Sequence, residues 1–354
     1  MNITTDFINN KSKEFDPEGL LEIAFNLHLQ IEKVLDLSQN WEIPEFQPQN
    51  IILLGMGGSA IGGDLLSAFM ADQVKVPMVV CRDYKIPAFV NENTLCIATS
   101  YSGNTEETLT AYEKCVEKRA RVVALSSNGK IEELSLKDGA WLGKVPGGYQ
   151  PRTALGFLFA SLYAVMVKTG LYKGKLDDLK NTAEFLKTIA NQWMSWTETE
   201  ENQPLKLAIS LKNRIPVVYS SSGYMETIAY RWKCQFNENS KMFATSTYFP
   251  ELNHNEIVGW GAPEGLLDDK FVIILREPEE NTRVKARIEL TREYLKKKVK
   301  VEEIFPKGET RLERLFYFIL FGDLLSIYLA YLYDKDPAEI DAIHWLKKEL
   351  AKLD

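Results

Sequence analysis

The amino-acid sequence predicts an α/β protein made of two doubly wound parallel-sheet domains that pack together and carry helical extensions. Short apolar runs are followed by glycine- or serine-rich turns and then by helical patterns, which is the repeat of a doubly wound sheet. The repeat stops and then starts again near residue 206. The length of 354 residues exceeds the roughly 250–300 residues at which a single core stops growing. We therefore expect an N-terminal helical segment (1–45), a first domain (46–170), a helical bridge (171–205) and a second domain with a C-terminal helix (206–354).

The first half opens with an amphipathic helical pattern from Pro17 to about Leu37. Ile51-Ile52-Leu53-Leu54 is a continuous apolar run, typical of a central parallel strand that is covered on both faces. Similar runs predict the other strands of this half at 78–81, 95–98, 122–125 and 142–145. A helix is expected from Thr153 to about Lys168.

The second half restarts after a helical pattern over 176–196. Strands are predicted at 216–219, 271–275 and 299–304, and helices at 225–236, 281–297, 309–333 and 337–353. The segment 315–333 is apolar enough to imitate a membrane span, but Asp323 at its centre would be costly in hydrocarbon. We expect it to be a buried helix of the second domain.

Composition excludes several classes of protein. The hydrophobic content of 45% and the charged content of 26% are those of a globular protein in water. A net charge of -7 argues against a general nucleic-acid surface. The four cysteines lack metal-ligand and redox spacing and are expected to be free thiols: Cys81, Cys96, Cys115 and Cys234. No leader pattern is recognised, so the expected location is the cytoplasm.

The turn Ser100-Tyr101-Ser102-Gly103-Asn104-Thr105 separates an apolar strand run from a helical pattern. A helix N-terminus presents unpaired N–H groups and the positive end of a dipole, which favours an anion. The hydroxyls of Ser100, Ser102 and Thr105 can donate to the same oxygens, and Gly103 allows a close approach. The turn lacks the lysine of a nucleotide-binding loop, so it predicts a site for the phosphate of a small molecule. The simpler alternative is an ordinary Ser/Thr cap.

A second turn, Gly55-Met56-Gly57-Gly58-Ser59-Ala60, overlaps the dinucleotide-binding pattern, with Asp83 as a ribose partner. Any strand-to-helix turn that approaches a ligand closely is rich in glycine, so this match has little specificity. A further phosphate-binding turn at 100–105 would be redundant in a dinucleotide site. We therefore expect no cofactor.

Candidates for acid–base chemistry lie mainly in the second half. Glu238 ends a helical pattern among amides, and His254 stands in a polar loop. Arg152 lies at a helix start. Two of these residues have a simpler interpretation: Glu238 as a solvated or capping carboxylate, and Arg152 as a partner in an ion pair. No metal site is expected, because neither a second histidine nor a cysteine is close to His254 in the sequence.

Taken together, the motifs resemble the bifunctional phosphoglucose/phosphomannose isomerases, which are built from two sugar isomerase (SIS) domains of the phosphoglucose isomerase superfamily. The resemblance covers about residues 50–350 in family order. It rests on Gly55–Ala60, Arg82-Asp83-Tyr84, Ser100–Thr108, Pro151-Arg152, Asn237-Glu238-Asn239 and Asn253-His254-Asn255-Glu256.

The resemblance implies a homodimer that interconverts glucose 6-phosphate and mannose 6-phosphate with fructose 6-phosphate through a cis-enediol. Glu238 matches the base, Arg152 the cation beside the enediolate, and His254 the ring-opening residue donated by the neighbouring subunit. Lys347 matches the lysine of the C-terminal helix, with Lys348 as an adjacent competitor. The phosphate-binding positions are Ser59, Ser100, Ser102 and Thr105, with Gly57 and Gly58 at the backbone approach.

One departure concerns Ala338-Glu339, where the family pattern has Thr-Pro; it leaves the balance between glucose and mannose substrates open. Two other functions also stay open. SIS modules serve as sugar-phosphate sensors, but a sensor would not need Glu238 and His254. Amidosugar-phosphate synthases have tandem SIS domains as well, but should carry an N-terminal amidotransferase domain, and only about 50 residues precede the first predicted strand. Nucleic acid and membrane partners are not expected.

Overall fold

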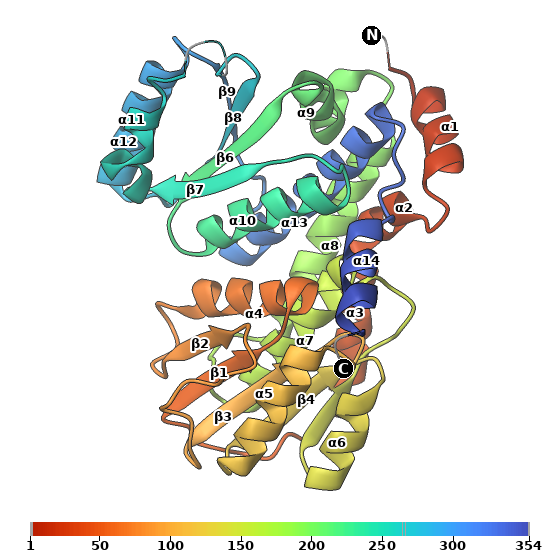
Figure 1. The fold of residues 1–354 in the computed structure, drawn as a ribbon, viewed down its shortest axis with the longest axis vertical. Coiled ribbons are helices and arrows are strands. Elements are labelled where there is room, and N and C mark those ends of the chain that lie inside the picture. The colour runs from red at the N-terminus through yellow and green to blue at the C-terminus, as the bar shows by residue number, and fades with distance from the viewer. Residues whose placement is uncertain (1–2, 264, 266, 353–354) are drawn as a thin grey trace. The chain divides into compact units, whose positions relative to one another are not determined.

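The computed structural model describes residues 3–263, 265 and 267–352. Its strands form two parallel sheets flanked by helices, which confirms the predicted α/β class (Figure 1). The chain divides into two compact units: unit 2 is Asn26–Lys187, and unit 1 is Met1–Phe25 with Thr188–Asp354. The expected domains 46–170 and 206–354 lie inside unit 2 and unit 1, respectively. The expected N-terminal segment and helical bridge are each divided between the two units.

The sheet of unit 2 has the strand order β2-β1-β3-β4-β5, and every pair is parallel. The strands are β1 (Asn50–Leu54), β2 (Met78–Cys81), β3 (Thr94–Thr99), β4 (Arg121–Ser126) and β5 (Trp141–Lys144). The order reverses between β1 and β3. In an open α/β sheet, ligands bind outside the carboxyl ends of the strands at such a switch point. The glycine-rich turn after β1 and the serine-rich turn after β3 meet there.

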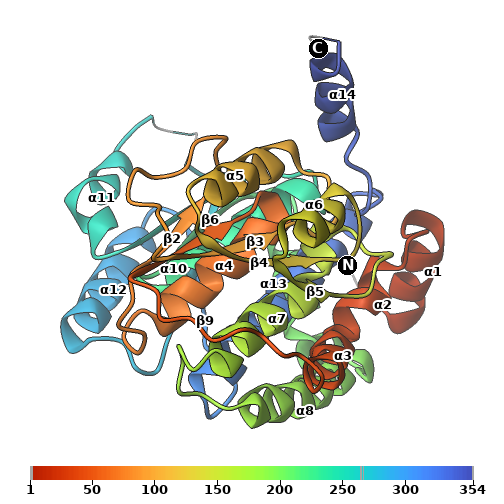
Figure 2. The same cartoon turned by 90° about the horizontal axis from the view of Figure 1, so that it is seen from below.

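Helices cover both faces of this sheet, with α5 and α6 on one face and α4 and α7 on the other (Figure 2). The helices of unit 2 are α3 (Leu27–Ser38), α4 (Gly57–Met70), α5 (Glu106–Glu117), α6 (Lys130–Asp138), the short η1 (Pro151–Thr153) and α7 (Leu155–Lys168). All of Ile51–Leu54 is buried, as the continuous apolar run predicts. Cys81, Cys96 and Cys115 are buried free thiols, as expected, and Cys234 in unit 1 is a free, partly buried thiol.

The sheet of unit 1 has the order β7-β6-β8-β9 and is also parallel. Its strands are β6 (Ile215–Ser221), β7 (Thr245–Phe249), β8 (Lys270–Leu275) and β9 (Lys300–Ile304). Its helices are α1 (Thr5–Phe15), α2 (Leu20–Phe25), the end of α8 (Leu176–Met194), η2 (Thr199–Glu201), α9 (Gln203–Leu211), α10 (Tyr224–Glu238), η3 (Glu251–His254), α11 (Glu256–Gly259), α12 (Thr282–Leu295), α13 (Arg311–Leu332) and α14 (Asp341–Leu350).

Helix α13 is the apolar helix that imitates a membrane span, and it is buried along its length inside unit 1. Its start is fixed by a capping box, in which Thr310 and Glu313 each bond the other's backbone N–H. Asp323 in its centre forms an ion pair with the buried Arg231 of α10 at 2.8 Å. The charge of Asp323, which made a membrane span unfavourable, therefore joins the core helices α10 and α13.

Several elements differ from the expectation. The pattern over 17–37 forms two helices, α2 and α3, because the backbone of Asn26 between them leaves the helical conformation. The side chain of Asp16 accepts hydrogen bonds from the N–H groups of Leu20 and Leu21 and so fixes the start of α2. The C-terminal helix begins at Asp341 rather than Pro337, since Asp336 accepts from the N–H of Ala338 and makes a turn there; Leu353, its expected end, lies outside the described residues. Strand β7 was not predicted, because a half-exposed edge strand lacks a continuous apolar run.

Candidate active site

The serine-rich turn of unit 2 is folded back on itself by its own hydroxyls. Ser100 is fully buried, and its Oγ donates to Oγ1 of Thr105 at 3.2 Å. The backbone N–H of Asn104 lies 3.4 Å from Oγ of Ser102, which is exposed. Gly103 has φ +69° at a place where a Cβ would meet the carbonyl oxygen of Asn128 at 1.6 Å. Only glycine fits there, so the hydroxyls converge around a tightly packed backbone.

The glycine-rich turn brings Ser59 to the same place. Ser59 lies in the first turn of α4, is buried, and its Oγ accepts a hydrogen bond from the N–H of Tyr101 at 3.1 Å. Within this described part of the chain, the residues before α4 and α5, Met56 and Thr105, provide no side-chain cap for their helices. Two helix N-termini thus meet at the switch point, and neither has a side-chain cap among the described residues; a helix N-terminus of this kind favours an anion.

Arg152 lies against this turn. It is 4% exposed and sits in η1, and a Cβ on Gly58 would come 2.6 Å from the carbonyl carbon of Pro151 and 2.7 Å from the nitrogen of Arg152. The absence of a side chain at Gly58 is what lets η1 approach α4. Gln30 of α3 holds η1 in turn, by donating to the carbonyl of Thr153 at 2.8 Å. Unit 2 therefore brings together Ser59, Ser100, Thr105, Gly58 and Arg152.

Glu238 is the last residue of α10 in unit 1, where it lines a pocket of about 630 Å³. The other lining residues come from the chain just after α10 and from the segment that leads into α14: Asn237, Lys241, Met242, Phe243, Lys335, Glu339, Ile340, Asp341, Ala342 and Ile343. The sequence singled out Glu238 and its flanking amides. It did not connect them with the segment 335–343.

Buried polar contacts to α13 fix the helix that carries Glu238. Asp323 accepts from Arg231 at 2.8 and 2.9 Å and from Gln235 at 2.7 Å. Asn239, directly after Glu238, donates to Ser326 at 2.9 Å. These contacts lie on successive turns of α10, so the position of Glu238 is determined by a helix that is itself buried in the core.

His254 stands at the opposite edge of the same sheet. It is exposed and ends η3, which follows the carboxyl end of β7. Helix α10 begins at the carboxyl ends of the strands and runs antiparallel to them. Its 15 residues span about 22 Å, so its last residue, Glu238, lies near the amino ends of the strands. Neighbouring residues anchor the loop: Asn253 donates to Thr291 at 2.9 Å, and Glu256 accepts from Tyr219 at 2.5 Å. Unit 1 therefore does not bring His254 and Glu238 together.

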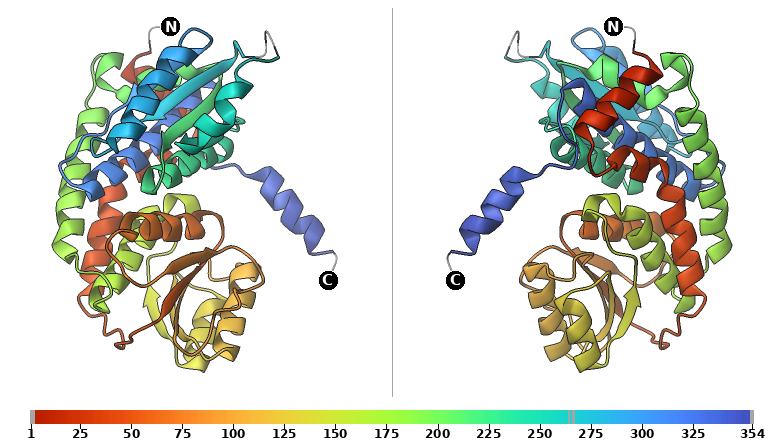
Figure 3. Two further views of the ribbon diagram at one scale, coloured as in Figure 1. Left: turned by 90° about the vertical axis from the view of Figure 1, so that its left-hand side faces the viewer. Right: turned by 90° about the vertical axis from the view of Figure 1, so that its right-hand side faces the viewer.

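Lys347 lies on α14, which extends away from the rest of unit 1 (Figure 3). No side chain within Asp341–Leu350, all of which the structure describes, is buried. Lys347 follows the pocket-lining Ile343 by four residues and shares its face of the helix. Lys348 follows Asp341, which also lines the pocket, by seven residues and shares the face of that residue.

Comparison with known proteins identifies the family. Residues 200–350 match the model of the bacterial phospho-glucose isomerase C-terminal SIS domain. The bifunctional phosphoglucose/phosphomannose isomerase of Caldicellulosiruptor bescii is 40% identical over 337 residues, covering 94% of this chain and 99% of the relative. The Thermoplasma acidophilum enzyme of the same name is 37% identical and covers 85% of this chain and 90% of the relative. The chain belongs to the bifunctional phosphoglucose/phosphomannose isomerase family.

The fold agrees with this assignment. The crystal structure of a hypothetical protein from Thermus thermophilus superposes with a TM-score of 0.75 at 18% identity, covering 98% of this chain and 93% of that one. At that identity the likeness concerns the fold alone, and it extends over both units. The chain is thus a member of an isomerase family, and its residues 200–350 match a SIS domain.

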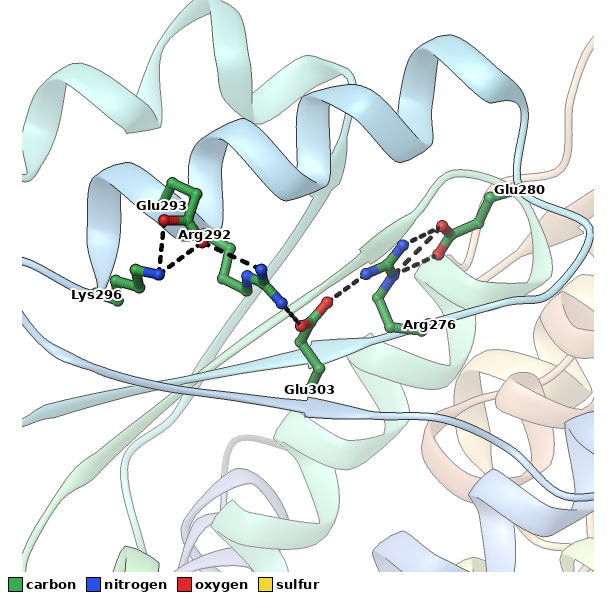
Figure 4. Close-up of polar contacts among 6 residues, drawn as sticks. All are labelled: Arg276, Glu280, Arg292, Glu293, Lys296 and Glu303. Carbon is green, nitrogen blue, oxygen red and sulfur yellow. Dashed lines mark hydrogen bonds and ion pairs between the residues drawn. The ribbon is translucent and has the colours of Figure 1, made fainter.

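In this member of the isomerase family, the second serine-rich turn, Ser220–Gly223, lies at the equivalent switch point of unit 1 but has a different setting. Strand β8 ends there at Leu275 and is followed by Arg276 and Glu277, and both of these side chains form ion pairs within the protein. Arg276 pairs with Glu280 at 2.8 Å and with Glu303 of β9 (Figure 4). Glu277 accepts from Tyr224 and pairs with Arg314 at 2.8 Å. Protein carboxylates therefore hold Arg276 and Arg314 beside this turn, whereas the serine-rich turn of unit 2, Ser100–Thr105, is the one predicted to bind phosphate and is called the phosphate-type turn below.

Sequence reasoning missed the residues that brace the phosphate-type turn of this isomerase. Ser126 and Ser127, at the end of β4, donate through their hydroxyls to the carbonyls of Ser100 and Tyr101, each at 2.7 Å. Burial raises the pKa of Tyr101 to about 12, so its phenol keeps the proton that it donates to the carbonyl of Pro146 at 2.8 Å. The available signal was the pair of hydroxyl residues at the carboxyl end of the next predicted strand.

A metal-binding group of side chains is not found in the described part of this isomerase. Among residues 3–263, 265 and 267–352, no three His, Cys, Asp or Glu side chains gather as a metal ion would require.

Proposed function

We propose that this protein interconverts glucose 6-phosphate and mannose 6-phosphate with fructose 6-phosphate in the cytoplasm. The observation that carries the proposal is the phosphate-type turn of unit 2, where buried hydroxyls and two helix N-termini converge in a chain of the bifunctional isomerase family. The relatives' printed activities supply the substrates.

The hydroxyls of Ser59, Ser100, Ser102 and Thr105 are proposed to hold the 6-phosphate. A hydroxyl has one proton to donate and two lone pairs with which to accept. Ser59 uses its oxygen to accept from Tyr101, so its proton is left to donate to a phosphate oxygen. Ser100 and Thr105 share one hydrogen bond, which leaves one of their two protons for the same purpose. Hydrogen bonds to an anion are about twice as strong as neutral ones.

The isomerisation is a proton transfer between neighbouring carbons, for which we assign the base to Glu238. The carboxylate removes the proton from C2 of the open-chain aldose, and the electron pair of that bond forms a C1–C2 double bond while the aldehyde oxygen becomes an enediolate. Return of the proton to C1, with transfer of the proton of the C2 oxygen to the C1 oxygen, gives the ketose. Arg152 is assigned to the enediolate oxygen, because a guanidinium lowers the energy of developing negative charge.

Lys347 is proposed as a further cation at the sugar. It shares a helix face with Ile343, which lines the pocket beside Glu238, and Lys348, which shares a face with the pocket-lining Asp341, is its adjacent competitor. Because the enediol has lost its stereochemistry at C2, one base can serve both epimers. Ala338 is buried and Glu339 lines the pocket, so the departure from the family's Thr-Pro lies beside Glu238. The ratio of the two isomerase activities is measured as kcat/KM with glucose 6-phosphate and with mannose 6-phosphate.

We also propose that the active form is a homodimer in which His254 of one subunit opens the ring of a sugar bound to the other. Three observations support this: His254 is exposed, its loop is anchored by Asn253 and Glu256, and unit 1 holds it at the sheet edge opposite Glu238.

The decisive experiment is exchange of the C2 proton with solvent in Glu238→Gln. A carboxamide cannot accept the proton, so exchange should fall by about 10²–10⁴-fold with both aldose phosphates. Glu226→Gln, in the first turn of the same helix, is the matched control and should exchange at the wild-type rate. Near wild-type exchange in Glu238→Gln would remove Glu238 from the reaction.

A further inference from the structure

Lys241 has an unusual backbone for a residue with a long side chain. The N–H of Met242 bonds the carbonyl of Phe236 at 3.0 Å, which closes the end of α10, and Lys241 takes the left-handed conformation with φ +56°. A Cβ is disfavoured at positive φ, so this backbone conformation is uncommon for a lysine. A lysine there points to a use for its side chain.

The ammonium group of Lys241 reaches four main-chain carbonyls. It donates to Glu238 at 2.8 Å and lies 3.3 Å from the carbonyl of Asn239, both at the end of α10. It also donates to Asp336 at 2.6 Å and lies 3.3 Å from the carbonyl of Pro337. An ammonium group has three N–H donors, so the two longer contacts share donors with the shorter ones.

A helix cap would explain only half of these contacts. Cations near the C-terminus of a helix commonly bond its last carbonyls, as Lys241 does with Glu238 and Asn239. Asp336 and Pro337 belong to a segment about 95 residues further along the chain, between α13 and α14. Lys241 therefore ties the end of the helix that carries Glu238 to the start of the segment that carries Lys347.

The pocket beside Glu238 lies between these two tied segments. Asn237 and Glu238 form one wall, and 339–343 form the other, with Lys241 also lining it. Helix α14 has no buried side chain of its own within Asp341–Leu350. Its first turn is thus held by the buried Pro337 and Ala338 and by the bonds from Lys241.

We propose that Lys241 is a positioning residue of the isomerase, which sets the separation between Glu238 and the segment leading to Lys347. The proposal rests on the proposed function for the role of Glu238, but the tie itself exists whether or not Glu238 is the base. Lys241 acts through the carbonyls that it holds and touches no reacting atom.

The test compares Lys241→Met, which keeps the methylenes and removes the donors, with Lys241→Gly, which removes the donors and suits the left-handed backbone. Arg119→Gly is the matched control, because Arg119 is an exposed residue with φ +61° after another helix. Hydrogen exchange of the purified, ligand-free full chain is measured first. Both Lys241 variants should exchange about ten- to hundredfold faster than wild type over 337–346, with no change over 51–70.

Kinetics complete the test. Both Lys241 variants should lose kcat by about tenfold or more, with a smaller change in KM, because the phosphate-binding turn in unit 2 is untouched. Unchanged exchange over 337–346 would overturn the proposal even if Glu238→Gln abolishes proton transfer. Faster exchange with unchanged kcat would also overturn it, since the tie would then have no bearing on the reaction. Loss in Lys241→Met but not in Lys241→Gly would show that backbone strain, rather than the missing donors, causes the effect.

Discussion

At the scale of single residues, the phosphate-type turn depends as much on missing side chains as on the hydroxyls. Gly58 stands where η1 crosses the first turn of α4, and backbone atoms occupy the space of its Cβ. Gly62, one turn later in the same helix, has its nearest neighbours at 3.6 Å, which is ordinary contact. A side chain is therefore sterically excluded at Gly58 but not at Gly62, four residues later.

We predict that Gly58→Ala displaces Arg152 and lowers both stability and activity. Forcing a methyl group into packed backbone typically costs about 1–3 kcal/mol, and kcat should fall because η1 moves with Arg152. Gly62→Ala should be neutral or stabilising by up to about 1 kcal/mol, because alanine is the better helix former. Urea unfolding and kcat measure the two effects. Equal behaviour of the two variants would contradict the packing argument.

A second prediction at this scale concerns Ser102, whose hydroxyl is exposed at the turn. Ser102→Ala should weaken binding of all three sugar phosphates by about 1–3 kcal/mol, the value of one charge-assisted hydrogen bond. The measurement is KM and the inhibition constant of inorganic phosphate. Ser67→Ala in α4 serves as the control outside the turn. Free glucose and mannose should be very poor substrates, and turnover of free sugars at the rate of the phosphates would refute the phosphate site.

At the scale of elements, the packing of α10 on α13 explains how an almost entirely apolar helix tolerates an aspartate. Asp323 is buried together with Arg231 and Gln235, and their bonds join the two helices on one side of the sheet of unit 1. A buried charge that keeps its partner is tolerated, whereas one that loses it is strongly destabilising.

We predict that Asp323→Leu destabilises the protein by about 3–5 kcal/mol, because Arg231 keeps its charge in the core without that carboxylate. The double variant Arg231→Met/Asp323→Leu should recover part of this loss, since it removes both charges from the core. Thermal and urea unfolding of the three proteins provide the comparison. If the double variant is no more stable than Asp323→Leu, the pair is not the cause.

At the scale of the whole molecule, the positions of Glu238 and His254 at opposite edges of one sheet bear on assembly. If two subunits share each site, a mixture of two inactive variants should regain activity. A heterodimer of Glu238→Gln and His254→Ala contains one site with both mutated residues and one site with both intact. We predict that mixing the two variants after partial unfolding restores measurable turnover with cyclic substrate.

The control for this experiment is mass spectrometry, which establishes that heterodimers have formed. His254→Ala alone should be impaired most with cyclic substrate and less with sugar presented in the open form, because its role is ring opening. Heterodimers that form without regaining activity would place both residues in one subunit.

The sequence by itself determined the class of fold and the phosphate-type turn. Central parallel strands must be apolar on both faces, so 51–54, 95–98 and 271–275 are visible as continuous runs. Turns at a switch point depend on local requirements, namely glycine for a close approach of the backbone and hydroxyl groups as hydrogen-bond donors. Both can be recognised within a segment of about six residues. The charged residue Asp323, together with Arg311, Glu313 and Arg314 just before the apolar stretch, predicted a buried helix rather than a membrane span for α13.

Only the tertiary structure decided which distant residues meet. The partner of Asp323 is Arg231, the turn at Ser100 is braced by Ser126 and Ser127, and Lys241 reaches a segment about 95 residues away. The local sequence does not say which residue such a side chain will meet, because a charged or hydroxyl side chain has the same sequence pattern whether its partner is water or a carbonyl group across the fold. The edge strand β7 was not predicted for a related reason. Its half-exposed side chains give no continuous apolar run, and the strand forms through its backbone pairing with β6.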